Sequence, residues 1–149
     1  MQAYHYTECG LDNVFIEGME TGNDHASEPT ITIPAIGLLH KVIAESIVNL
    51  PFKMTGKELR FLRTEMGLTQ ERLARILKVT NITVSRWERE ETAIKDTAEM
   101  LVRLMAVHEL ELDESMNVNE MSEKVTSSPQ NTPIRIDGSD PLRYQPLAA

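Results

Sequence analysis

The segment of residues 55–109 constrains the fold most, because four short helical patterns follow one another there with very little chain between them. In each pattern apolar residues recur three and four positions apart, which is the period of an amphipathic helix. Thr55, Thr69, Thr80 and Asp96 stand at the starts of the patterns, where a side-chain oxygen can cap the free amides of a helix. Helices this short are stable only when packed on one another, so a compact helical bundle is expected.

The predicted helices cover about 56–66, 70–77, 81–90 and 96–110. Thr55 with Glu58 has the spacing of a capping box, and Asp96 with Glu99 repeats it. Gly67 follows the first helix and suits a left-handed helix end. The side chains predicted to face inward are Leu59, Leu62, Met66, Leu73, Ala74, Leu77, Val84 and Trp87, together with Leu101, Leu104 and Met105.

The chain on either side of this bundle carries weaker patterns. Residues 1–52 predict a short hairpin with its turn near Cys9–Asn13, a third strand at 30–33 and an amphipathic helix at 35–50. Residues 113–149 are poor in large apolar side chains and predict a flexible tail, in which Ile134 and Ile136 could add one strand. The predicted fold class is therefore mainly α: a helix-turn-helix bundle at 53–112 with a small N-terminal antiparallel β element.

Charge is distributed unevenly along the chain. The formal net charge of −8 argues on its own against a nucleic-acid partner. Residues 53–95 nevertheless carry +4, between flanks of −6 each at 1–52 and 96–149. A basic island of this kind is typical of a nucleic-acid-facing module within an acidic protein. The acidic flanks should then project away from the DNA, because they would repel its phosphates.

The predicted helices at 70–77 and 81–90 have the spacing of a helix-turn-helix motif. The sequence GKELRFLRTEMGLTQERLARILKVTNITVSRWERE closely resembles the Cro/CI-type (xenobiotic-response-element-type) domain of the lambda-repressor-like fold over residues 55–109. The resemblance implies a DNA-binding regulator whose second motif helix enters the major groove. It also implies an internal ion pair between Arg63 and Glu88, and a Gln70 that binds a phosphate and braces the recognition helix. Lys78 departs from the family, because a glycine usually occupies this left-handed turn.

The resemblance places three residues at base-edge positions: Asn81, Ile82 and Arg86. A guanidinium can bind guanine through two hydrogen bonds, an asparagine can do the same with adenine, and Ile82 can contact a thymine methyl group. Trp87 is expected in the core rather than stacked on a base. The residues expected to contact the DNA backbone are Gln70, Thr69, Thr80, Thr83, Ser85, Arg89 and Lys95.

No catalytic or cofactor site is expected. The chain shows no nucleophile, base and orienting group in any motif, and no glycine loop for phosphates, so we expect no enzyme and no cofactor. His5, Cys9 and His25 are residue types that bind zinc. The layout resembles MqsA-type antitoxins, which join an N-terminal zinc module to a domain of this class. The paired cysteines of those proteins are absent here, so no metal is expected.

The favoured function is transcriptional repression by a homodimer on a double-stranded DNA operator, because one recognition helix reads one half-site. The helix at 35–50 or the region near Leu110 and Leu112 could supply the dimer contact. The alternative is an antitoxin whose acidic N-terminal region binds a toxin and whose DNA binding regulates its own operon. A pure interaction scaffold without DNA affinity is the third possibility. The lone Cys9, the absence of a secretory signal and the lack of a membrane-length apolar run predict a cytoplasmic protein.

Overall fold

The computed structural model describes residues 3–19, 21–23, 29–31, 35–113, 116–140 and 142–147. The chain divides into two compact units, one made of residues 1–43 and 132–149 and the other of residues 44–131. The predicted division into 1–52, 53–112 and 113–149 differs from this one. It treats the two ends of the chain as separate parts, whereas the structure joins them in one unit.

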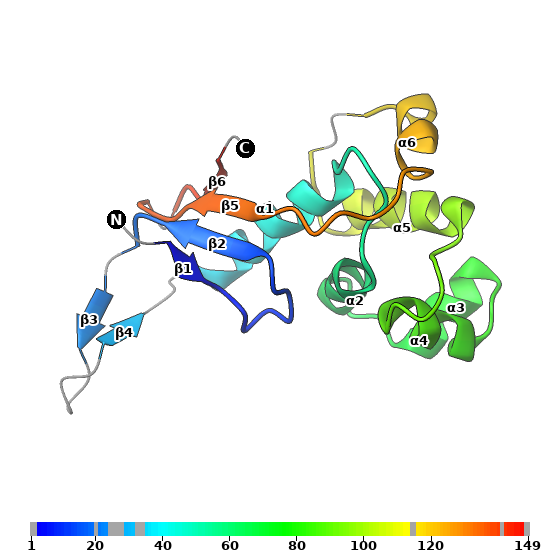
Figure 1. Ribbon diagram of the computed structural model, residues 1–149, viewed down its shortest axis with the longest axis horizontal. Helices are drawn as coiled ribbons and strands as arrows, with labels where there is room; N and C mark the ends of the chain where they lie inside the picture. The colour runs from blue at the N-terminus through cyan, green and yellow to red at the C-terminus, as the bar shows by residue number, and fades with distance from the viewer. Residues whose placement is uncertain are drawn as a thin grey trace. The chain divides into compact units, whose positions relative to one another are not determined.

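The first unit is built on a small mixed sheet (Figure 1). Its strands, in order of pairing, are β1 (Tyr4–His5), β2 (Val14–Glu17), β5 (Ile134–Asp137) and β6 (Gln145–Pro146). β1 and β2 form the predicted antiparallel hairpin, and β5 runs parallel to β2. The side chains of Val14, Ile16 and Ile136 are fully buried, so one face of the sheet forms the core of this unit.

Two further strands pair in the first unit, β3 (Thr21–Asn23) with β4 (Pro29–Ile31), in antiparallel register. β4 overlaps the strand expected at 30–33, whose last two residues lie outside the described part of the chain. β3 lies within residues 18–29, a polar segment rich in Gly, Asn, Asp and Pro whose composition predicts a loop. The helix α1 (Ile36–Val48) confirms the predicted amphipathic pattern, and its residues Leu39, Ile43 and Ile47 are fully buried. The Tyr6 hydroxyl hydrogen-bonds His40 Nε2 of this helix at 2.8 Å.

The second unit is helical and matches the predicted bundle closely. Its helices are α2 (Gly56–Glu65), α3 (Gln70–Leu77), α4 (Asn81–Glu88), α5 (Asp96–Glu109) and α6 (Val118–Lys124). Thr55 and Glu58 form the predicted capping box at the start of α2. Gly67 closes that helix in the left-handed conformation, at a φ of 72°. The fold class is thus mainly α, with a helix-turn-helix and a small β element, although two of the strands come from the end of the chain.

The predicted capping box at the start of α5 is wrong. Lys95, not Asp96, is the N-cap residue, and its side chain makes no capping hydrogen bond. Glu99 is fully buried instead and points to other partners: its carboxylate accepts from the Lys53 ammonium at 3.2 Å and from the Met54 amide at 2.9 Å. Glu99 has the spacing of a capping residue, but its carboxylate binds the Lys53 ammonium and the Met54 amide instead of the helix terminus.

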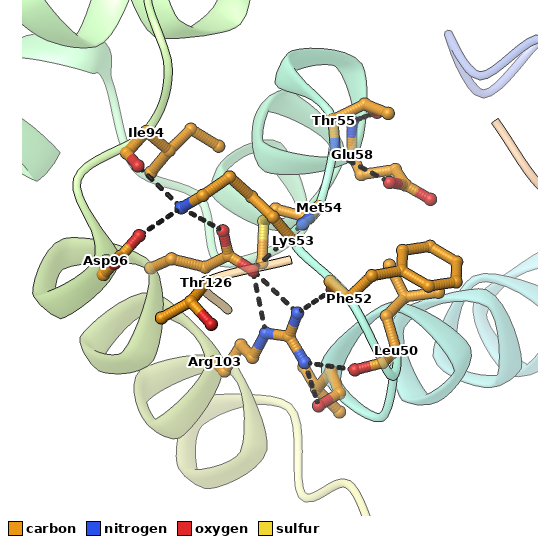
Figure 2. Close-up of polar contacts among 12 residues, drawn as sticks. Leu50, Phe52, Lys53, Met54, Thr55, Glu58, Ile94, Asp96, Arg103 and Thr126 are labelled. Carbon is orange, nitrogen blue, oxygen red and sulfur yellow. Dashed lines mark hydrogen bonds and ion pairs between the residues drawn. The ribbon is translucent and has the colours of Figure 1, made fainter. Parts of the chain in front are cut away.

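Arg103 completes this buried network, and Figure 2 shows its hydrogen bonds. Its guanidinium binds the Glu99 carboxylate at 2.7 Å and donates to the carbonyls of Leu50 at 2.8 Å and Phe52 at 2.6 Å. Arg103 and Glu99 are both 0% exposed. A buried charge persists only when it is paired and hydrogen-bonded, and both conditions are met here. The network fastens the chain before α2 to α5.

The flexible tail expected over 113–149 differs from the structure. Met121 and Val125 of the α6 region are fully buried, and Ile134 and Ile136 bury their side chains in the sheet, as the possible strand predicted. This segment has few apolar residues, but other elements of the structure cover those that it has. Burial against other elements offsets the entropy of ordering that the segment could not offset alone.

Candidate nucleic-acid interface

α3 and α4 form a helix-turn-helix whose caps and turn follow from the local sequence. Thr69 caps α3 by accepting from the Arg72 amide at 3.0 Å, and Thr80 caps α4 by accepting from the Thr83 amide at 3.1 Å. The turn passes through Lys78, which adopts the left-handed conformation at a φ of 60°. The chain therefore keeps the turn that the family makes with glycine, at a backbone cost of about 1 kcal/mol.

The inner faces of the motif pack as predicted. Leu73 and Ala74 of α3 and Val84 and Trp87 of α4 are buried. Of the other side chains predicted inward, Leu59 and Leu62 are buried, whereas Met66, Leu77, Leu104 and Met105 are only half-buried. Leu101 is wrong as a core residue, since it is 40% exposed and α5 buries Val102 and Ala106 instead. The inner packing fixes which face of α4 points outward.

A polar cluster locks the end of α4 to α2 and α3. Arg63 Nε donates to Glu88 at 2.6 Å, and a second guanidinium nitrogen donates to the same carboxylate at 3.0 Å. Arg63 also donates to the Leu68 carbonyl at 2.8 Å, and Gln70 Nε2 donates to Glu88 at 3.1 Å. The Arg63–Glu88 ion pair is thus confirmed. Two-point pairing of this kind holds both groups in a single orientation, so α4 is held rigidly against its neighbours.

The outward face of α4 carries the three residues predicted to contact bases. Asn81 and Arg86 are exposed, and neither side chain forms a hydrogen bond or an ion pair within the described part of the chain. Ile82 is 61% exposed, which is unusual for a large aliphatic side chain. The three side chains therefore offer a guanidinium, an amide and an apolar surface to a partner. None of these groups has an internal partner among the described residues.

The residues predicted to contact the DNA backbone differ in how far their side chains are exposed and unpaired. The Thr80 and Thr83 hydroxyls hydrogen-bond each other at 2.8 Å, and Ser85 is half-buried. Arg89 pairs with Glu91 at 2.8 Å, so part of its charge is already neutralised. Lys95 is exposed beyond the recognition helix, while Thr69 lies exposed at the start of α3 beside the half-buried Gln70.

Two further cations on the motif were not among the predicted contacts. Arg72 on α3 and Lys78 in the turn are exposed, and neither is paired with any residue that the structure describes. Their only sequence signal was their position within the basic island. A solvated helix face often carries such charges, so the sequence did not single them out.

The metal-capable side chains of the N-terminal region have other partners. His5 Nε2 hydrogen-bonds the Asp12 carbonyl at 2.7 Å, and the Cys9 thiol lies 3.6 Å from the Tyr6 carbonyl. His25 lies outside the described residues. Within the described ranges no group of three His, Cys, Asp or Glu side chains is placed to hold a metal ion. No helix in those ranges is long and apolar enough to cross a membrane.

The fold and the braced, outward-facing second helix define a DNA-binding protein of the helix-turn-helix class. Residues 59–114 match the family model described as helix-turn-helix, which supports the resemblance to Cro/CI-type regulators. The function this supports is that of a DNA-binding transcriptional regulator, in a family that is generally non-enzymatic. No curated protein and no solved structure gives a significant match to the chain.

Proposed function

We propose that this protein is a sequence-specific transcriptional repressor that binds its operator as a homodimer in the cytoplasm, with α4 in the major groove. The outward face of α4 carries this proposal. Asn81, Ile82 and Arg86 are exposed on a helix whose other end is fixed by the Arg63–Glu88 pair. A guanidinium carried by a rigid helix can read guanine with little loss of backbone entropy.

The acidic composition sets a second expectation for DNA binding. The cations available for phosphates lie in the basic island, and Arg89 already has an acidic partner. Few counterions should therefore be released on binding, so we expect a modest dependence of affinity on salt and weak non-specific binding. Specificity should then come mainly from the base contacts.

The dimer contact is proposed to involve α5 and α6. The helix at 35–50 buries most of its apolar stripe internally, although Ile36 at its start is 51% exposed, and Leu112 is buried as well, so the surfaces first considered are only partly free. Leu101 of α5 is 40% exposed and Val118 of α6 is 54% exposed. If a second copy covers them, Leu101→Glu should shift the protein from dimer to monomer in sedimentation equilibrium. An unchanged dimer would place the contact elsewhere.

Selection of bound sequences from random DNA duplexes at two salt concentrations tests whether the protein recognises a specific DNA sequence. We expect an enriched palindromic sequence, and a loss of about 1–3 kcal/mol for Arg86→Ala that is confined to one base position in each half-site. Arg75→Ala is the matched control, because Arg75 is exposed on α3 and already paired with Glu71 at 3.2 Å. If Arg86→Ala lowers the affinity for all DNA sequences equally, Arg86 contacts only phosphate. No enrichment and no salt dependence would refute DNA recognition.

An antitoxin role is the second candidate, and one observation favours it. Residues 1–43 form, together with residues 132–149, a compact unit distinct from the helix-turn-helix unit, as a partner-binding module would. The charge of this unit suits a basic partner, because residues 1–43 carry −5 and residues 132–149 carry no net charge. Co-expression with a neighbouring small reading frame, followed by purification of a complex, tests this. If the product of that reading frame is not toxic, or does not bind this protein, the antitoxin role is contradicted.

A further inference from the structure

A cleft of about 420 Å³ opens in the second unit beside the end of α4. Its walls come from Trp87 at the end of that helix, the following loop of residues 90–94, the segment of residues 53–56 and the residues Pro129 and Asn131. This volume lies within the range of sites that hold small organic molecules. Neither the predicted DNA contacts nor the buried network requires an opening here.

Trp87 lines the cleft and carries an indole N–H that has no partner among the described residues. The residue is only 4% exposed, and its indole N–H makes no hydrogen bond within the described part of the chain. No fully buried side-chain nitrogen or oxygen among the described residues lacks a partner. The indole N–H is therefore not sealed in the core, and the cleft is the opening that Trp87 lines. An indole N–H at such a place normally finds an acceptor.

Glu90 places a strained and unpaired charge at the same cleft. It follows α4 in the left-handed conformation, at a φ of 61°. The bond from its amide to the Trp87 carbonyl, at 3.1 Å, closes the helix end. Glycine would adopt this conformation without steric cost, whereas glutamate costs about 1 kcal/mol. This conformation places the Glu90 side chain beside Gly56 of the cleft wall, and its carboxylate has no partner among the described residues.

The remaining charged groups determine which ligand the cleft can take. Lys53 is held by Asp96 at 2.9 Å, by Glu99 at 3.2 Å and by the Ile94 carbonyl at 2.7 Å, so its ammonium is not available to attract an anion. Glu91 is neutralised in part by Arg89. The charge left without a partner is that of Glu90, which makes the cleft attractive to cations.

We propose that this cleft binds a small planar organic cation that also carries a hydrogen-bond acceptor. The Glu90 carboxylate pairs with the cationic group, and the Trp87 indole N–H donates to the acceptor. The planar part lies in the space between residues 53–56 and the loop after α4. This binding needs no DNA, so it stands or fails separately from the proposed repressor function.

The experiment uses the full ¹⁵N-labelled chain, in which Trp87 is the single tryptophan and gives the single indole N–H resonance. Three probes of the same shape are titrated: 4-hydroxybenzamidine, the neutral 4-hydroxybenzamide and the anionic 4-hydroxybenzoate. The cation should move the indole resonance in a saturable way. The neutral and anionic probes should bind at least about threefold more weakly, as the loss of one partly exposed ion pair requires.

Variants connect the effect to Glu90. Glu90→Gln should weaken binding of the cation by about three- to fivefold while the backbone spectrum shows an intact fold. Glu111→Gln is the matched control, because Glu111 is an exposed glutamate at a φ of 53° that does not line the cleft. An indole resonance that stays fixed up to about 10 mM probe, or equal affinity for all three probes, would overturn the proposal. So would an unchanged affinity in Glu90→Gln.

Discussion

Replacing Arg103 by methionine removes the most connected side chain of the buried network. Arg103→Met keeps an unbranched side chain of similar length but deletes all its donors. The Glu99 carboxylate would lose its bond at 2.7 Å, and the carbonyls of Leu50 and Phe52 would lose bonds at 2.8 Å and 2.6 Å. Because the site is 0% exposed at Arg103, water cannot replace these partners without opening the packing.

The expected loss of unfolding free energy is about 3–5 kcal/mol, the usual cost of breaking a buried ion pair from one side. Glu99 would keep Lys53 at 3.2 Å and the Met54 amide at 2.9 Å, which keeps the loss from being larger. Domains of this size have about 5–15 kcal/mol in total, so the variant should still fold but near its limit.

Urea denaturation followed by Trp87 fluorescence measures this directly, since Trp87 lies in the unit that contains the network. Arg75→Met is the control: its ion pair with Glu71 joins side chains 66% and 72% exposed, and its loss should change stability by less than about 0.5 kcal/mol. A loss below about 1 kcal/mol for Arg103→Met would refute the argument that the buried carboxylate and carbonyls depend on this guanidinium.

Three further predictions concern single positions. Glu111→Gly should raise stability by about 0.5–1 kcal/mol in thermal unfolding, because it relieves a φ of 53° at the end of α5; a loss would show that the strain is not real. Gly56→Ala should lower stability by about 1–3 kcal/mol, although alanine favours helices, because its Cβ would lie 2.2 Å from the Trp87 carbonyl oxygen. The Tyr4 hydroxyl donates to Glu8 and holds the pKa of that carboxyl below its usual 4.5, so stability from this bond is present above pH 4.5 and is lost as the pH falls through the lowered value. In Tyr4→Phe the Glu8 pKa measured by NMR should rise toward 4.5, and a pKa that did not move would assign the shift to other groups.

The helix-turn-helix could be predicted because its information is local. Thr55, Thr69 and Thr80 cap the helices that follow them, and the spacing of apolar residues decides which faces turn inward. The Arg63–Glu88 pair joins residues 25 positions apart, and only the resemblance to a known family placed it. Nothing in periodicity alone would have found it.

The features that sequence reasoning missed depend on distant residues. Glu99 has the spacing of a capping residue, and only the approach of Lys53 from 46 positions away makes it a buried ion-pair partner. The parallel pairing of β5 with β2 joins Val14 to Ile134, a separation that no local pattern indicates. The base contacts of α4 are in an intermediate position: the helix and its exposed face were predictable, but the DNA sequence they read is not encoded in any single residue.

The pairing of β2 with β5 also has a consequence for the order of events on the ribosome. The helix-turn-helix unit is one continuous stretch of chain, residues 44–131, and its contacts can form as soon as that stretch has emerged. The sheet is different, because β2 must wait for more than a hundred further residues before its neighbour β5 exists. Until then β2 has an open edge, so nascent chains halted before residue 134 should be the ones that chaperones bind and proteases cut.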